Sequence, residues 1–227
     1  MKKIILTVVT AILLGISCKK KDAPNPVPVP TFKFMSLTAG SSWNYELVNN
    51  AAPSTTTFKL ISTSRDSTIN GKAYHVYTNS RSGNEYYNIT GNDYLNFRSL
   101  PAAIGGSFVE YIYLKDNAAA GASWSQSFAV TANGFPINAT LNNTVTAKGI
   151  TKVVKGITYN NVYHVTTTLS VSVSGFPIPA SGLSTDIQTF YAEKFGVIQS
   201  INKINLNYLG ITDNTDQQTN LLSADIK

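Results

Sequence analysis

Histidine is the residue best suited to general-base catalysis or zinc binding near neutral pH, and this chain has two, His75 and His164. Each lies in the same triplet, Tyr-His-Val. A catalytic or zinc site would require carboxylates nearby, and neighbouring strands could bring Glu85, Asp93 and Asp186 close. None of these acids stands at a metal-ligand spacing from a histidine. We therefore expect no catalytic residue, no metal and no cofactor, with both histidines facing solvent or lying at a sheet edge.

Sequence motifs of enzymes are also missing. The chain has no nucleophile elbow, phosphate-binding loop or paired-carboxylate motif. Glycosidases position their two acids through the fold rather than through a motif, so glycosidase-type activity stays open. The motifs as a whole favour a non-enzymatic role.

Aromatic side chains form the other chemically conspicuous group. When exposed on a sheet they stack on sugar rings, whereas in the interior they pack across strands and need only their polar atoms satisfied. Packing is the commoner role in a β domain of this size. The residues that we consider as ligand-binding candidates are Trp43, Trp124, Tyr86, Tyr87, Tyr111 and Tyr113.

Cys18 is the only cysteine, so it cannot form a disulfide within the chain. Residues 1–17 run from two lysines through an apolar stretch to Ser17, which is the pattern of a secretory signal peptide too short to span a membrane. The stretch "LLGISC" resembles a bacterial lipobox, although Gly15 stands where that motif prefers leucine. The resemblance implies that Cys18 is lipidated and becomes the first mature residue, and a signal peptide with a chance cysteine is the alternative.

Residues 18–30 read as a tether between this lipid and a folded domain. They contain three lysines followed by four prolines and show no hydrophobic periodicity, so they favour an extended, semi-rigid stalk. The chain has a net charge of +6, but residues 31–227 hold 13 basic and 11 acidic residues, so much of the excess lies in the signal peptide and tether. Nucleic-acid binding needs basic residues clustered on the binding face, and we therefore exclude it.

Residues 31–227 are expected to fold as a single all-β domain. They are rich in Thr, Val, Ile, Tyr and Phe, alternate in polarity and contain no convincing amphipathic helix. We predict an antiparallel meander that forms a strongly curved sheet or a partly closed barrel. The predicted strands are 43–48, 57–64, 73–78, 85–89, 93–97, 108–114, 124–132, 138–147, 162–173, 187–192, 197–209 and 220–226.

Turn signals set the order of pairing. Asn70-Gly71 predicts a type I′ hairpin turn, because that turn requires positive φ at both central residues. Short loops such as "SRSGN" and "EKFG" keep consecutive strands adjacent. The segment "GFPI" occurs twice, at 134–137 and 175–178, and its proline places both copies at loop tips or edges.

Two halves of the domain share recurring features. "AGSSWNYEL" and "AGASWSQSF" put the two tryptophans in matching positions, and a Tyr-His-Val strand follows each. These echoes predict quasi-repeats at about 38–97 and 119–201. In that scheme each histidine lies on the strand face opposite its core-facing tyrosine and valine.

The segments "CKKKD", "WNYEL", "INGKAYHVY", "YY" before "GNDYL" and "FYAEKFGVIQS" together resemble the uncharacterised envelope lipoproteins of the Bacteroidota. The resemblance implies a lipid-anchored protein of the outer membrane, on its periplasmic face or at the cell surface. It also implies a curved half-barrel of the kind found in the carriers that move lipoproteins across the periplasm.

The expected function is that of a binding or structural module anchored to a membrane through its N-terminal lipid. A concave face lined by Ile, Leu and Phe with an open mouth would favour a carrier of a lipid or other apolar small molecule. An exposed ridge of tyrosine and tryptophan would favour glycan binding instead, and a filled interior would favour a structural role or a protein partner. No pattern in the sequence indicates an oligomeric state.

Overall fold

The computed structural model describes residues 34–100, 104–132 and 134–227, and every described element is a β-strand. The predicted signal peptide and tether lie outside the described residues. The first six strands are β1 (Ser42–Asn49), β2 (Ser54–Ile69), β3 (Lys72–Asn79), β4 (Gly83–Thr90), β5 (Asp93–Ser99) and β6 (Phe108–Lys115). The others are β7 (Ser123–Ala132), β8 (Phe135–Val154), β9 (Ile157–Val173), β10 (Phe176–Pro177), β11 (Leu183–Ala192), β12 (Gly196–Tyr208) and β13 (Ile211–Asp225).

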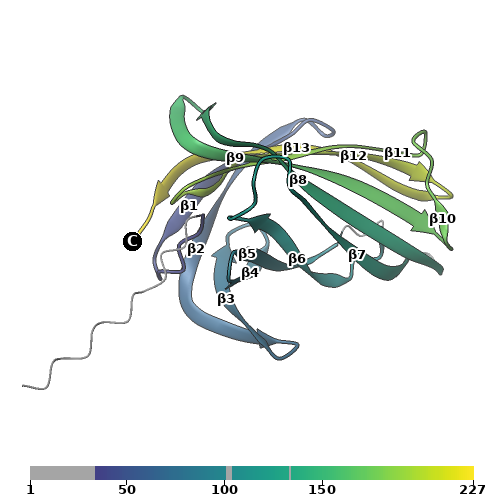
Figure 1. The fold of residues 1–227 in the computed structure, drawn as a ribbon, viewed down its shortest axis with the longest axis horizontal. Coiled ribbons are helices and arrows are strands. Elements are labelled where there is room, and N and C mark those ends of the chain that lie inside the picture. Colours follow the sequence, from purple (N-terminus) through teal and green to yellow (C-terminus); the bar gives the residue numbers. More distant parts are fainter. Residues whose placement is uncertain (1–33, 101–103, 133) are drawn as a thin grey trace, which may run out of the picture. The chain divides into compact units, whose positions relative to one another are not determined.

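All thirteen strands belong to one antiparallel sheet, and the predicted all-β class is confirmed. Its order is β6-β5-β4-β3-β2-β1-β13-β12-β11-β9-β8-β7, with the short β10 paired to β9 (Figure 1). Most consecutive strands are hydrogen-bonded neighbours; the exceptions are that β1 pairs with β13, that β9 pairs with β11 past the short β10, and that β6 and β7 share no ladder. The sheet curls until its two edge strands, β6 and β7, lie next to each other without a backbone ladder between them. The domain is therefore the partly closed barrel that the alternation and turns predicted.

The turns explain why the strands follow one another in this order. Asn70 and Gly71 have φ values of 52° and 78°, as the predicted type I′ turn requires. Lys155 and Gly156 adopt the same left-handed conformation, at 50° and 80°, and join the two longest strands, β8 and β9. Each turn returns the chain beside the strand it has just left.

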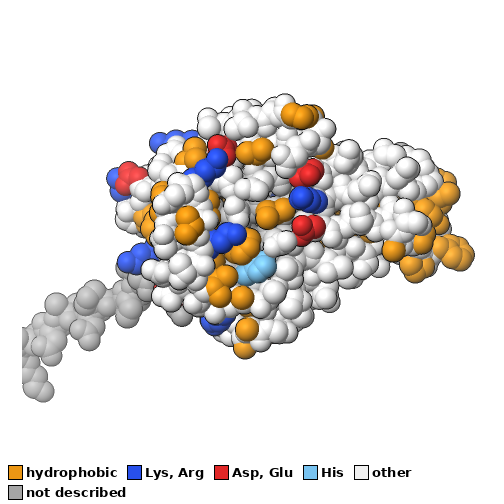
Figure 2. Space-filling view, turned by 90° about the horizontal axis from the view of Figure 1, so that it is seen from above, with side chains coloured by type: hydrophobic (Ala, Val, Ile, Leu, Met, Phe, Trp, Pro, Cys, Tyr) orange, Lys and Arg blue, Asp and Glu red, His pale blue; other side chains and the backbone are white. Residues whose placement is uncertain are grey.

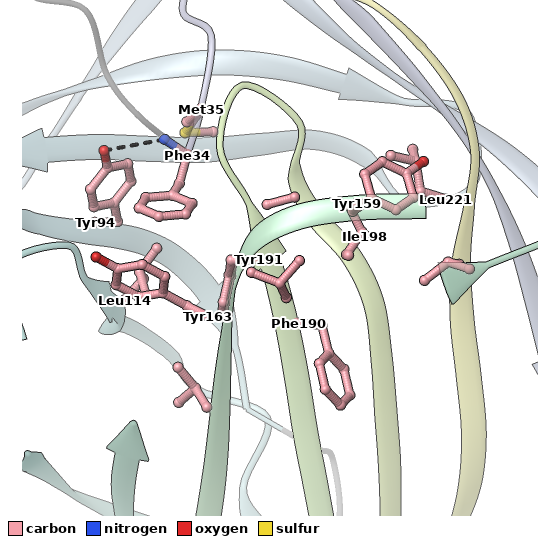
Figure 3. Close-up of a cluster of buried hydrophobic side chains, with 14 of the residues drawn as sticks. Phe34, Met35, Tyr94, Leu114, Tyr159, Tyr163, Phe190, Tyr191, Ile198 and Leu221 are labelled. Carbon is pink, nitrogen blue, oxygen red and sulfur yellow. Dashed lines mark hydrogen bonds between the residues drawn. The ribbon is translucent and has the colours of Figure 1, made fainter. Parts of the chain in front are cut away.

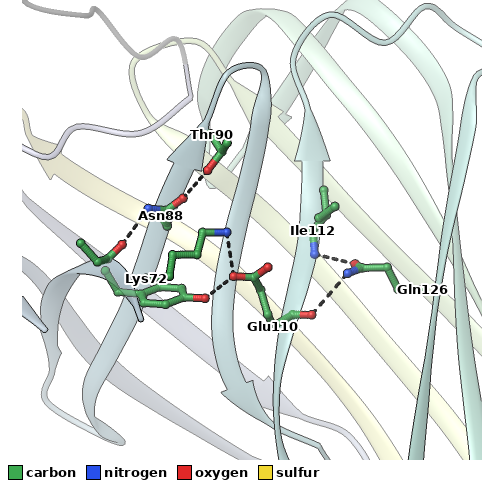
Figure 4. A network of polar contacts seen from close by, with 8 residues as sticks. Lys72, Asn88, Thr90, Glu110, Ile112 and Gln126 are labelled. Atoms are coloured by element: carbon green, nitrogen blue, oxygen red, sulfur yellow. Dashed lines mark hydrogen bonds and ion pairs between the residues drawn. The ribbon is translucent and has the colours of Figure 1, made fainter. Parts of the chain in front are cut away.

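The seam between β6 and β7 is bridged by side chains. The Gln126 amide of β7 accepts a hydrogen bond from the Ile112 backbone N–H at 2.6 Å and donates to the Glu110 carbonyl at 3.3 Å (Figure 4). The indole N–H of Trp124 donates to the Ile112 carbonyl at 2.9 Å. Backbone groups at a sheet edge need partners when they are shielded from water, and these two side chains supply them for β6.

Two hydrophobic clusters lie along the barrel, and strand alternation turns many of their side chains to its inside. The aromatic cluster includes Trp43 and Tyr77. It also includes Phe34, Tyr94, Tyr163 and Tyr191, which Figure 3 labels. The aliphatic cluster includes Leu100, Ile104, Ile137, Leu169, Val171, Ile204 and Ile211. The two ends of the barrel are thus filled by chemically different side chains.

Candidate functional site

A cavity of about 290 Å³ lies inside the barrel, between the two clusters. Its volume is at the lower end of the range of roughly 300–1,000 Å³ that is usual for small-molecule sites. One part of its wall is aliphatic and is formed by Leu141 of β8, Leu169 of β9, Ile187 of β11 and Ile204 of β12. In this part of the cavity a ligand would make van der Waals contacts, which do not require a particular orientation.

The other end of the cavity is aromatic, and its hydroxyl groups are hydrogen-bonded. Tyr77 donates to the Ser36 carbonyl at 2.6 Å, and Tyr87 donates to Glu85 at 2.7 Å. Burial raises the pKa of Tyr87 well above its usual value, with the Glu85 charge adding to the shift, and burial also raises that of Tyr113. These phenols therefore stay protonated at physiological pH and serve as packing and hydrogen-bonding groups.

A polar group separates the two ends. Asn143 is fully buried on β8, and its Oδ1 accepts hydrogen bonds from the Tyr111 hydroxyl at 2.8 Å and the Thr167 hydroxyl at 2.6 Å. Its Nδ2 has no hydrogen-bond partner among the described residues. Both hydroxyl donors line the cavity, so the wall between the aromatic and aliphatic ends is polar.

Arg98 of β5 is the one charged side chain among the described residues that line the cavity. Its guanidinium lies 5.8 Å from the centre of the Tyr111 ring, a cation–π distance, and no carboxylate of the described chain forms an ion pair with it. Arg98 is exposed to solvent although it lines the cavity. The cavity therefore carries a positive charge with no neutralising acid in its wall.

His75 takes part in a chain of contacts in the order found in serine hydrolases. Its Nε2 lies 2.9 Å from the Ser62 hydroxyl oxygen, and its Nδ1 lies 3.0 Å from Asp66 Oδ1. In a serine hydrolase the nucleophilic serine is accessible and the acid is shielded. Here Ser62 is 1% exposed, whereas the Asp66 side chain is 69% exposed. A buried hydroxyl is poorly placed to reach a substrate, and the contacts instead span the register shift between Ser62 and Asp66 of β2.

The expectation that both histidines face solvent is wrong for His75. Its side chain is 13% exposed and shares the inward face of β3 with Tyr77, while the neighbouring Tyr74 and Val76 are buried on the outward face. On the outward face the Tyr74 hydroxyl donates a hydrogen bond to the Glu110 carboxylate of β6. The same carboxylate forms an ion pair with Lys72 at 2.8 Å (Figure 4). Both faces of β3 are covered, so polarity alone did not reveal which one turns inward.

His164 lies on the outward face of β9, opposite the cavity-lining Thr167 and Leu169. Its ring stacks on Phe190 at 4.2 Å, and burial lowers its pKa. The two histidines thus lie on opposite faces of the sheet. No group of three or more His, Cys, Asp or Glu suited to holding a metal ion occurs within the described ranges.

The structure brings four of the six predicted aromatic candidates together. Trp43, Tyr87, Tyr111 and Tyr113 line the cavity. Trp124 instead bridges the seam, and Tyr86 points to the other face of β4 from Tyr87.

The sequence reasoning missed Arg98, Asn143 and Thr167. They stand in alternating strands, where polar residues normally mark the solvent face. Asn96 and Arg98 lie two residues apart on the same face of β5, and both line the cavity. This spacing was the one feature of the sequence that could have indicated that they share a site.

Comparisons with known proteins gave structural likeness only. No protein-family model matches the chain, and no curated protein matches it. Two solved structures are similar: a "putative lipoprotein" from Parabacteroides distasonis (TM-score 0.47, 11% identity) and a "putative exported protein with YmcC-like fold" from Bacteroides fragilis (TM-score 0.46, 9% identity). Each match covers 85% of this chain and 99% of the other.

Proposed function

We propose that the barrel is a non-enzymatic binding module for a small amphipathic ligand, one with an apolar tail and an acidic head. The observation that carries the proposal is the interior cavity, whose described wall is aliphatic at one end and contains one charged side chain, Arg98, with no ion pair to a described carboxylate. An acidic head beside Arg98 would gain a charge-assisted hydrogen bond. The tail would then lie against Leu169 and Ile204, where burial of apolar surface is favourable.

Glycan binding is supported less well by the same geometry. A sugar-binding platform needs aromatic faces that project into solvent. Within the described chain, none of the six aromatic candidates is among the exposed large hydrophobic residues. The interior position of Trp43, Tyr87 and Tyr113 suits the enclosure of an apolar ligand better.

We further propose that the mature protein is held at the outer membrane by a lipid on Cys18. The proposal rests on the signal peptide and lipobox pattern of residues 1–18. Among the described residues, no helix has the length and apolar character needed to cross a membrane. Mass spectrometry of the mature wild type should show acyl groups that Cys18→Ala removes, whereas a wild-type mass without acyl groups would contradict the anchor.

The binding role can be tested by filling the cavity. Ala139 of β8 is buried and lines it, whereas Ala129 on the paired strand β7 is exposed. In the chain from Lys19 onward, which keeps every described residue, Ala139→Leu should weaken binding of a fluorescent fatty acid at least about tenfold, because the added carbons compete for the same space. Ala129→Leu is the matched control.

Thermal unfolding of both variants distinguishes a blocked cavity from a damaged fold. A folded Ala139→Leu protein that binds the fatty acid as tightly as the Ala129→Leu protein would refute interior binding. Absence of saturable binding by the wild type would refute it as well.

A further inference from the structure

One end of the barrel carries exposed apolar side chains at the tips of three hairpins. Phe135 follows the β7–β8 turn, Phe176 follows the β9–β10 turn, and Leu209 lies in the β12–β13 turn, with exposed fractions of 44%, 72% and 66%. We call residues 134–137, 173–183 and 207–212 the apolar rim. In Figure 2 hydrophobic side chains gather at the right-hand end of the molecule, where Figure 1 labels β10.

Backbone hydrogen bonds make the three tips one continuous edge. Val173 pairs with Ile137 of β8 on one side and with Phe176 of β10 on the other. The Asn207 N–H donates to the Gly182 carbonyl at 2.8 Å, which fastens the β12–β13 turn to the segment before β11. The exposed side chains are therefore held together by the sheet.

The rim contains no Asp, Glu, Lys or Arg. The opposite end of the same β8–β9 hairpin offers a contrast, since the exposed Val153 and Ile157 stand there among Lys152 and Lys155. Charged side chains at the bilayer centre are costly, whereas phenylalanine and leucine partition favourably into it. The two ends of one hairpin thus differ in the property that decides whether a surface can enter lipid.

The rim is also continuous with the aliphatic end of the interior. Ile137 and Ile211, next to the exposed tips, belong to the buried aliphatic cluster, and Leu169 and Ile204 of that cluster line the cavity. A ligand tail in the cavity would therefore lie nearest the end of the barrel that carries the rim. Phe34, the first described residue, belongs to the aromatic cluster instead.

We propose that the apolar rim inserts into the interfacial region of a lipid bilayer. Protein-binding hot spots are enriched in Trp, Tyr and Arg, whereas the exposed tips offer Phe, Leu and Pro and no charge. Fifteen residues lie between Cys18 and Phe34, and the sixteen residue-to-residue steps can span at most about 55 Å, which matches the length of a 17-residue strand such as β9. The bilayer that holds the proposed lipid anchor is thus within reach of the rim.

Vesicle binding by the chain from Lys19 onward, which lacks the anchor, tests the rim alone. The wild type should float with neutral phosphatidylcholine vesicles, in high salt as in low salt, because the rim has no charge to be screened. The variant Phe135→Ser/Phe176→Ser should lose at least about tenfold of this binding. The control Val153→Ser/Ile157→Ser, at the charged end of the same hairpin, should bind as the wild type does.

Insertion also has a spectroscopic signature. Phe176→Trp should give a blue-shifted emission on vesicle addition and should be quenched by brominated lipid, whereas Val153→Trp should do neither. The rim variant should keep its affinity for fatty acid, since neither phenylalanine lines the cavity, so failure of the rim and failure of the proposed ligand site are separate results.

Three outcomes would overturn the proposal. Equal vesicle binding by wild type and rim variant would show that the rim does not insert. Loss of wild-type binding in high salt would assign the contact to surface charge. A wild type that ignores vesicles but self-associates through the rim would assign it to a second copy of the chain.

Discussion

The two ends of the barrel interior are closed by different forces. At the aromatic end, rings with polar tips are tied to the backbone: Trp43 donates to the Phe195 carbonyl at 2.8 Å and Tyr163 donates to the Asp116 carbonyl at 3.0 Å. At the aliphatic end, Leu169, Ile204 and their neighbours have no polar atoms with which to form such bonds. Directional bonds fix one arrangement, whereas aliphatic packing can be replaced by contacts with a ligand. The aromatic end is therefore held by directional bonds, and the aliphatic end is where the proposed ligand tail would replace side-chain contacts.

Large-to-small substitutions should give the largest difference between the two ends in the free energy of unfolding. Trp43→Ala should lower the free energy of unfolding by about 3–5 kcal/mol, because it removes a buried ring and its hydrogen bond. Leu169→Ala should cost about 2 kcal/mol, the lower limit for such changes, because leucine is smaller than tryptophan and its side chain forms no hydrogen bond. Urea unfolding followed by circular dichroism measures both, and equal losses would show that the ends do not differ in this way.

At the boundary between the ends, Arg98 should select the head of the ligand. Arg98→Met keeps most of the side-chain length and removes the charge, so binding of a fatty acid should weaken about tenfold, or about 1.4 kcal/mol. Binding of the matching fatty alcohol should change little. Isothermal titration with both compounds makes the comparison, and an equal effect on acid and alcohol would remove Arg98 from head-group recognition.

The smallest expected effect concerns pH at the aromatic end. His164 stacks on Phe190 of the aromatic cluster, and burial lowers its folded-state pKa. Below the ordinary histidine value of about 6.5, the unfolded chain binds a proton more readily than the folded one, so this contribution to stability falls as the pH falls. His164→Phe keeps the stacked ring without the proton. Its melting temperature should decline less than that of the wild type between neutral and mildly acidic pH, and parallel declines would exclude the effect.

Strand positions could be predicted well because they depend on local signals. All twelve predicted strands overlap strands of the sheet, and the Asn70-Gly71 turn has the predicted conformation. β13 begins earlier than predicted, at Ile211, because its polar first half, which includes Asp213 and Asp216, is held by the ladder to β12. β10 was not predicted, since two residues give no periodic signal.

The site was harder to predict because alternation separates two faces without saying which one turns inward. On β3 the apolar Tyr74 and Val76 face outward and are covered there, while His75 faces inward. Arg98 and Asn143 likewise look like solvent-facing residues in their strands and lie in or beside the cavity wall. The quasi-repeats remain a prediction, and the two Tyr-His-Val triplets occupy different environments.

Interior binding can be observed most directly with a fatty acid that carries a nitroxide at the end of its chain. In the wild type the label should broaden the methyl resonances of Leu169 and Ile204, which line the aliphatic end, and leave those of Val153 and Ile157 sharp. That pattern would put the tail inside the barrel at the predicted end. Broadening confined to Val153 and Ile157, or no broadening at saturating ligand, would contradict the account.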